Sequence, residues 1–224
     1  MSKAKAYVAW SSGKDSAYAL HQVRRSGEVE IVGLLTTTNE TFNRVAMHGV
    51  RDELLDRQAA ALGLPCLKVK LPWPCTNDIY EARMAEACER IKKDDVRHIV
   101  FGDLFLEDLR AWREQKLAET GMTGLFPLWK RDTAALAREM LDAGMVAHLA
   151  CIDLKKLDRS FAGRRFDAAL LGDLPAGIDP CGENGEFHTV VSAGPMFSRP
   201  ISIQPGEIVE RDGFVFADFI PSDG

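Results

Sequence analysis

The segment from Trp10 to Ser16 limits the fold of this chain more than any other. It reads Trp-Ser-Ser-Gly-Lys-Asp-Ser, follows an apolar run at 6–10 and opens a segment with helical periodicity at 15–25. A strand that turns through small residues into a helix brings free backbone N–H groups and the positive end of the helix dipole to one point. Such a point attracts phosphate. The sequence therefore predicts an anion site between its first strand and its first helix.

The residue types in this segment suit phosphate chemistry. Gly13 allows close approach of the backbone to an anion, and Lys14 adds a positive charge. Asp15 would repel phosphate unless a Mg²⁺ ion joined the two, so we expect Asp15 to be the metal ligand. The alternative is an ordinary Ser/Gly turn, and the segment does not fit the longer Walker A pattern. The expected phosphate donors are Ser11, Ser12, Gly13, Lys14 and Ser16.

Apolar bursts alternate with helical patterns over the first hundred residues. This rhythm predicts a doubly wound parallel sheet of the α/β class, whose ligands bind beyond the carboxyl ends of the strands. Strands are expected at 6–10, 29–36, 67–71 and 96–101, and helices at 15–25, 50–62 and 77–92.

The pattern changes after residue 102. A helix is expected at 106–119, a loop around Gly121–Pro127, a helix after Asp132 and a strand at 146–152. Short strands are expected at 188–192, 201–203, 206–211 and 214–220. A boundary near Pro127–Arg131 would divide the chain into a phosphate-loop domain at 1–128 and a smaller α+β domain at 129–224.

Composition excludes several classes of protein. The 224 residues carry a net charge of −5, which argues against a broad basic surface for nucleic acid. Five scattered cysteines without a Cys-x-x-Cys pair favour free thiols in a reducing cytoplasm. No apolar run reaches the length of about eighteen residues that a membrane span needs. We therefore expect a cytoplasmic protein with no membrane partner.

A second motif lies at 179–189 and reads Asp-Pro-Cys-Gly-Glu-Asn-Gly-Glu-Phe-His-Thr. Its two glycines permit tight turns, so Glu183, Glu186 and His188 could converge on one small polar ligand. The alternative is a solvated surface loop, which the composition of the motif alone favours.

The two motifs together resemble the diphthine–ammonia ligase family of PP-loop, or N-type, ATP pyrophosphatases. The resemblance rests on Ser-x-Gly-Lys-Asp-Ser near the N-terminus and Gly-Glu-x-Gly-Glu-Phe-x-Thr later in the chain. Gly102-Asp103, Arg113-Glu114 and Pro127-Leu128-Trp129 resemble the family as well, and the likeness extends over most of the chain. Ser12 stands where the first glycine of the usual pair would be.

The resemblance implies a HUP-type ATPase domain, similar to the adenine nucleotide alpha hydrolases. It implies a ligase that uses Mg²⁺ and ATP to adenylylate a carboxylate, releases pyrophosphate, and forms an amide with ammonia or an amine. The acceptor would be a small molecule or a carboxylate carried by a protein. The sequence leaves open whether the protein forms a homodimer.

The site residues are carried over from the family position by position, except His188, whose role is taken from the chemistry of the second motif. Lys14 and Asp15 are expected to be catalytic, with Glu186 as a cation-binding carboxylate and His188 as a proton acceptor. The nucleotide is expected at Ser11, Ser12, Gly13, Lys14, Asp15, Ser16, Leu35, Thr36, Thr37 and Gly102. The acceptor or ammonium is expected at Arg113, Glu114, Gly182, Glu183, Gly185, Glu186 and Thr189.

Two departures from the family pattern indicate a divergent branch of the family, such as a bacterial branch. The segment after Gly102 is more acidic than expected, and His188 stands where many members carry an acidic residue. Two other functions remain as alternatives: an ATP pyrophosphatase of tRNA thiolation, and a nucleotide-binding regulatory module of the universal stress type. His48 is expected to be a capping or surface imidazole, with a role over the nucleotide as the alternative.

Overall fold

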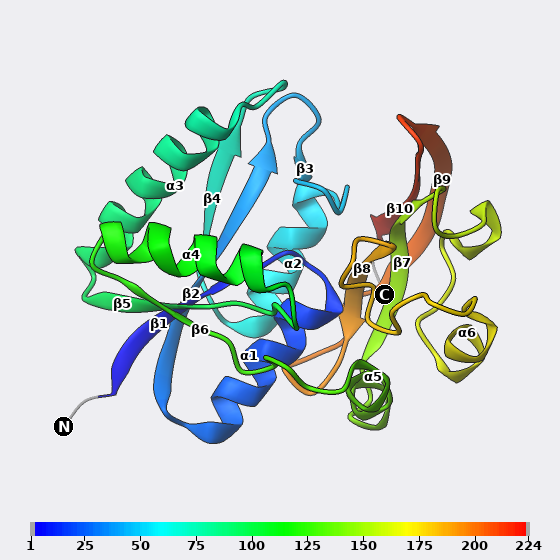
Figure 1. The fold of residues 1–224 in the computed structure, drawn as a ribbon, viewed down its shortest axis with the longest axis horizontal. Helices are drawn as coiled ribbons and strands as arrows, with labels where there is room; N and C mark the ends of the chain where they lie inside the picture. Colours follow the sequence, from blue (N-terminus) through cyan, green and yellow to red (C-terminus); the bar gives the residue numbers. More distant parts are fainter. Residues whose placement is uncertain (1–2, 223–224) are drawn as a thin grey trace.

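The computed structural model describes residues 3–222, which form two β-sheets and the helices that cover them (Figure 1). The first sheet contains β1 (Ala4–Ala9), β2 (Val29–Asn39), β3 (Arg44–Val45), β4 (Cys66–Leu71), β5 (Val96–Val100) and β6 (Thr123–Leu125). The second contains β7 (Val146–Asp153), β8 (Phe187–Ala193), β9 (Ile203–Arg211) and β10 (Phe214–Pro221). The helices are α1 (Lys14–Ser26), α2 (Asp52–Leu62), α3 (Asn77–Lys92), α4 (Glu107–Glu119), α5 (Thr133–Asp142) and α6 (Ala168–Asp173), with a short 3₁₀ turn at Arg159–Phe161.

The first sheet is parallel except for β3, and this confirms the predicted fold class. Strand β1 lies between β2 and β5, β4 pairs with the far side of β2, and β6 pairs with β5. Strands β2 and β4 therefore lie on one side of β1, and β5 and β6, which come later in the chain, lie on its other side. In such sheets the ligand crevice lies beyond the carboxyl ends of the strands where the order reverses, here β1 and β5.

Alternating side chains along β1 explain the layers on either side of this sheet. Ala6 and Val8 are fully buried in one hydrophobic cluster with residues of α1 and α2, whereas Tyr7 belongs to a second cluster with residues of α3 and α4. Figure 1 shows α3 and α4 side by side over one face of the sheet.

The second sheet is antiparallel, with the order β8-β7-β10-β9. Its buried residues, among them Val190 and Val215, join the same cluster as α1 and α2, so one core continues from the first sheet into the second. This arrangement brings β8 next to the start of α1, where the backbone N–H of Val191 donates to the carbonyl oxygen of Ser12 at 2.9 Å.

Two parts of the first sheet differ from the sequence prediction. The expected loop around Gly121–Pro127 contains β6, whose Gly124 pairs with Ile99 of β5. Strand β2 extends to Asn39 rather than ending at Thr36, because β4 pairs with it along its last six residues. Within residues 3–222, no helix is both long and apolar enough to cross a membrane.

Candidate active site

The predicted phosphate loop, residues 11–16, runs from the end of β1 into α1 at the carboxyl edge of the first sheet. Gly13 precedes the first helical residue, Lys14, and Ser12 has a φ of 69°. That left-handed conformation is one that glycine adopts freely, which agrees with Ser12 standing where related loops carry glycine. The Ser12 hydroxyl is buried and has no hydrogen-bond partner among the described residues. It is therefore a polar atom available to a ligand.

The second sheet holds this loop in place. The Lys14 N–H donates to the Thr189 hydroxyl at 3.0 Å. Gln58, which is fully buried on α2, donates from Nε2 to the carbonyl oxygens of Ser12 (3.2 Å) and Val191 (2.8 Å). The Oε1 atom of Gln58 accepts from the indole N–H of Trp10 at 3.0 Å. One buried amide thus joins the phosphate loop to β8.

The Lys14 side chain is 1% exposed and lies between the two motifs. Its Nζ donates to both carboxylate oxygens of Asp15, at 2.9 Å each, and to the carbonyl oxygen of Cys181. Burial would lower the pKa of Lys14, but the carboxylate of Asp15 reverses this effect and holds the pKa above its usual value. Burial raises the pKa of Asp15, and the ammonium of Lys14 opposes the shift.

The segment after β5 forms a second wall of the site. Gly102 packs on the start of α1, where an added Cβ would lie 2.7 Å from the backbone carbon of Asp15 and 2.8 Å from the Ser16 nitrogen. The next residue, Asp103, pairs with Arg113 at 2.8 Å. Burial raises the pKa of Asp103, Arg113 opposes this, and the charge of Asp15 adds to the rise. Asp103 therefore connects Arg113 electrostatically with the phosphate loop.

The acidic Gly-rich motif folds into a tight loop. Gly182 and Gly185 have φ values of 73° and 79°, as their predicted role in turns requires. The Glu186 carboxylate is 2% exposed, and its Oε1 accepts from the Asp179 N–H and from the Asn184 side chain, at 3.1 Å each. Its Oε2 is buried without a hydrogen-bond partner among the described residues. Glu186 thus holds its own loop in shape.

Glu183 faces the opposite wall. Its Oε1 accepts from the backbone N–H of Leu104 at 2.7 Å and of Phe105 at 3.4 Å. Burial raises the pKa of Glu183 to about 7; the hydrogen bond from Leu104 opposes this, and the charge of Asp15 adds to it. The two sequence motifs were expected to serve separate parts of the site. The structure places the two motifs in contact, since the acidic loop packs on Lys14 and on residues 104–105. Their separate roles remain a prediction.

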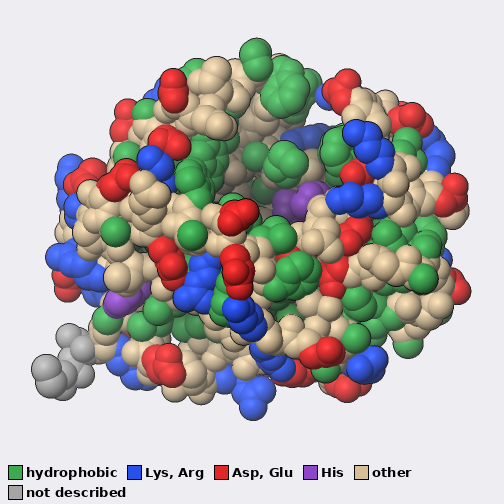
Figure 2. All heavy atoms as spheres, in the orientation of Figure 1, with side chains coloured by type: hydrophobic (Ala, Val, Ile, Leu, Met, Phe, Trp, Pro, Cys, Tyr) green, Lys and Arg blue, Asp and Glu red, His purple; other side chains and the backbone are tan. Residues whose placement is uncertain are grey.

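A pair of imidazoles lies against the phosphate loop. The rings of His48 and His188 have centroids 4.5 Å apart, and Nδ1 of His48 donates to the Thr189 carbonyl oxygen at 3.2 Å. Burial lowers the pKa of His48 to about 3, with a further contribution from His188, and lowers that of His188 to about 4. Both rings are therefore neutral at neutral pH. Figure 2 shows imidazole side chains (purple) on the wall of a hollow between the two sheets.

The remaining predicted residues lie in β2, where the Thr36 hydroxyl donates to the Trp10 carbonyl oxygen at 2.8 Å, and on α4. Leu35, Thr36 and Thr37 lie within β2 rather than after it, and the carbonyl oxygens of Leu35 and Thr37 already accept from Trp10 and Ala46. Glu114 is 47% exposed and pairs with Arg110 on the surface of α4. The structure brings the other predicted residues of the two motifs, together with Gly102, into one contiguous region. They are Ser11, Ser12, Gly13, Lys14, Asp15, Ser16, Gly102, Gly182, Glu183, Gly185, Glu186, His188 and Thr189.

Three residues that shape the site were not among the predicted site residues. Gln58 could have been found as an amide in the apolar stripe of α2, and Asp103 by its place directly after Gly102. The sequence left a role over the nucleotide for His48 as the alternative to a capping or surface imidazole, but its contact with His188 could not be foreseen, because it joins positions far apart in the sequence.

The site suits a phosphate chain with a metal ion. The orphaned Ser12 hydroxyl, the start of α1 and Lys14 are one set of groups suited to anions. Among residues 3–222, no three His, Cys, Asp or Glu side chains are grouped to hold a metal ion by themselves. Mg²⁺ is usually bound by one or two carboxylates together with substrate phosphates, so Asp15 beside the phosphate loop fits that pattern.

Comparisons with known proteins match both halves of the chain to one family. Residues 4–124 match the diphthamide synthase N-terminal domain, and residues 132–217 match the diphthamide synthase C-terminal domain. Relatives from zebrafish and human, both named diphthine–ammonia ligase, are 28% and 24% identical. In each case 92% of this chain is aligned, with 89% of the zebrafish and 85% of the human protein. A fission yeast relative of the same name is 26% identical over 90% of this chain, which spans 36% of its length.

Proposed function

This chain belongs to the diphthamide synthase family, and on that premise we propose that it is an ATP-dependent, AMP-forming ligase that converts a carboxylate into an amide. The overall reaction takes ATP, an acceptor carboxylate and ammonia to AMP, pyrophosphate and the amide. The contact that supports this proposal best is the hydrogen bond from the Lys14 N–H to Thr189, which unites the two motifs in one site. The relatives carry the name of a ligase that uses ammonia.

In this proposal the N-terminal half, 1–128, binds the nucleotide. The Ser11–Ser16 loop holds the phosphates through hydroxyl and backbone donors, and the Lys14 ammonium offsets the charge that develops at the α-phosphate. Lys14 is suited to this role because its charge is kept by the Asp15 carboxylate despite nearly complete burial. Mg²⁺ held by Asp15 and the phosphates would supply further neutralisation of the phosphate charge. Leu35, Thr36 and Thr37 stay proposed contacts of the base.

The C-terminal half, 129–224, contributes the acceptor side. Glu183 is better placed than Glu186 to meet ammonium or a cationic acceptor, because it reaches across to Leu104 and its charge interacts with that of Asp15, whereas the hydrogen bonds of Glu186 Oε1 stay within its own loop. We therefore assign Glu186 a positioning role. The neutral His188 imidazole accepts the proton released when the amine attacks the activated carboxylate. Arg113 acts at a distance, through Asp103.

From the relatives' name we take only the classes of substrate. These are ammonia and a carboxylate acceptor, which is either a small molecule or a group carried by a protein. Two alternatives predict other outcomes. A thiolating pyrophosphatase would transfer sulfur to RNA, and a regulatory nucleotide-binding module would bind ATP without turnover.

The test measures the products of ATP turnover by phosphorus NMR, with ammonium and a panel of carboxylates. We expect AMP and pyrophosphate, and we expect Asp15→Asn to lose at least tenfold in turnover while unfolding like the wild type. Asp108→Asn, which removes an exposed carboxylate from the first turn of α4, is the matched control. ADP as the sole product would refute the family chemistry, and full turnover by Asp15→Asn would refute the role given to that carboxylate.

A further inference from the structure

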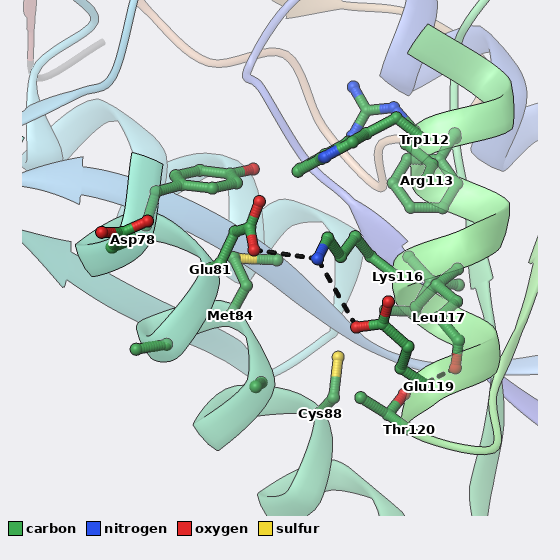
Figure 3. A pocket seen from close by; sticks show the side chains of 15 residues that line it. Asp78, Glu81, Met84, Cys88, Trp112, Arg113, Lys116, Leu117, Glu119 and Thr120 are labelled. Carbon is green, nitrogen blue, oxygen red and sulfur yellow. Dashed lines mark hydrogen bonds and ion pairs between the residues drawn. The ribbon is translucent and has the colours of Figure 1, made fainter. Parts of the chain in front are cut away.

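A cavity of about 400 Å³ lies between α3 and α4, on the face of the first sheet that the second sheet does not cover (Figure 3). Its floor is formed by Ile99 and Phe101, which belong to or follow β5. Figure 3 shows Met84 and Cys88 of α3 facing Leu117 of α4 across the space. This volume is within the range of small-molecule sites, which are mostly apolar with a few polar groups.

An aromatic pair stands at the end of the cavity nearest the carboxyl edge of the sheet. The rings of Tyr80 on α3 and Trp112 on α4 have centroids 6.1 Å apart and an interplanar angle of 34°. Together with the Phe101 ring, these side chains make an apolar wall of the cavity. Arg113 and Phe126 already pack on the Phe101 ring, so the rings of Tyr80 and Trp112 are the ones that can attract a further cation. The cavity can therefore hold a hydrocarbon body and favours a positive group over a negative one.

The charged residues at the rim of the cavity also favour a positively charged ligand. Lys116 is placed between two carboxylates, at 2.9 Å from Glu81 and 3.5 Å from Glu119, so its charge is already compensated (Figure 3). Asp78, also at the rim, is exposed, and no ion pair within residues 3–222 includes it. The rim carries three carboxylates against one ammonium.

The second cation that lines the cavity is also occupied. Arg113 pairs with Asp103 at 2.8 Å and lies over the Phe101 ring at 4.5 Å. An anionic ligand would have to compete with carboxylates for both Arg113 and Lys116. It would also approach the excess negative charge of the rim.

We propose that this cavity is a binding site for a small amphipathic amine, with its hydrocarbon body against Ile99, Phe101 and Leu117 and its ammonium at the rim beside Asp78, where it would share the Glu81 carboxylate with Lys116. The site is separate from the phosphate loop, because the Arg113–Asp103 pair and Gly102 lie between them. The proposal does not depend on the function proposed above.

Calorimetry with three probes of equal chain length tests the charge preference. n-Octylamine, 1-octanol and octanoate share the hydrocarbon body and differ in the head group. We expect octylamine to bind at a ratio of one to one, about fivefold more tightly than octanol and more tightly still than octanoate, as partly exposed charge pairs allow. The preference for the amine should shrink at high salt. Equal affinity for the three probes would overturn the proposal.

Two variants locate the bound amine. Ala85→Phe places a ring at the mouth of the cavity from an exposed position of α3 and should abolish octylamine binding. Glu81→Gln should weaken octylamine severalfold and leave octanol unchanged. Its matched control is Glu86→Gln, which removes a carboxylate of the same helix that does not line the cavity.

Thermal unfolding of each variant establishes that it folds before binding is compared. Octylamine affinity that is unchanged in folded Ala85→Phe would show that the amine binds elsewhere and would overturn the proposal. Equal weakening by Glu81→Gln and Glu86→Gln would reduce the effect to net charge and would overturn it as well.

Discussion

Replacing Gly102 by alanine should disturb the phosphate loop from behind. The φ angle of Gly102 is not in the left-handed region, so alanine can adopt its backbone conformation. The added Cβ would nevertheless lie 2.7 Å from the Asp15 carbonyl carbon, 2.8 Å from the Ser16 nitrogen and 2.9 Å from the Asp15 oxygen. Ordinary contact begins at 3.4 Å, so the segment after β5 and the start of α1 must separate by about 0.7 Å in a close-packed region.

The magnitude follows from two opposing effects. Overpacking of this kind costs about 1–3 kcal/mol, whereas the smaller conformational freedom of alanine in the unfolded chain returns about 0.4–1 kcal/mol. We expect a net loss of about 1–2 kcal/mol in the free energy of unfolding, measured by urea denaturation. Because the displaced atoms include the Ser16 nitrogen at the start of α1, ATP affinity measured by calorimetry should fall about tenfold.

The control for this variant is Gly172→Ala. Gly172 lies inside α6, and an added Cβ there would have no heavy atom within 4 Å. Alanine should leave nucleotide affinity unchanged and raise stability by up to about 1 kcal/mol. If Gly102→Ala kept both the stability and the ATP affinity of the wild type, the close approach of β5 to α1 would have no role in forming the site.

Two further predictions concern pH. Glu183→Gln should gain stability relative to the wild type as the pH rises from 4.5 to about 7. Over this range the folded wild type retains a proton on Glu183 that the unfolded chain has released. If urea titrations gave a stability difference that did not depend on pH, the buried state of this carboxyl would be contradicted. The wild type should lose stability as the pH falls from 6.5 towards 4, since the unfolded chain binds protons at His48 and His188 that the folded protein does not. In the same titrations His188→Asn should reduce this loss, and an unchanged acid slope would count against a buried imidazole pair.

Local patterns were sufficient for most of the fold. The interval of α3 was predicted to the residue, and the expected helix after Asp132 and strand at 214–220 correspond to α5 and β10. Strand β6 was missed because its three residues, Thr-Gly-Leu, carry no periodicity and owe their conformation to pairing with β5.

The predictability of the site has the same physical basis. The phosphate loop was visible because its chemistry lies within seven consecutive residues, from Trp10 to Ser16. The Lys14–Cys181 and His48–His188 contacts were not visible, because they exist only when the second sheet packs on α1. Even the direction of the Lys14 side chain, into the C-terminal half and onto Cys181, depends on that packing.

The two bonds from β8 to the phosphate loop have a consequence for how the protein is made. A growing chain that has passed Leu125 already contains every strand of the first sheet, but Thr189 and Val191 do not yet exist. At synthesis rates of about 5–20 residues per second, the roughly 60 residues still to come take about 3 to 12 seconds. During that interval the ribosome carries a loop whose Lys14 N–H and Ser12 carbonyl lack their β8 partners. The predicted phosphate loop is thus translated well before β8 and acquires its full set of hydrogen bonds only after β8 has been made.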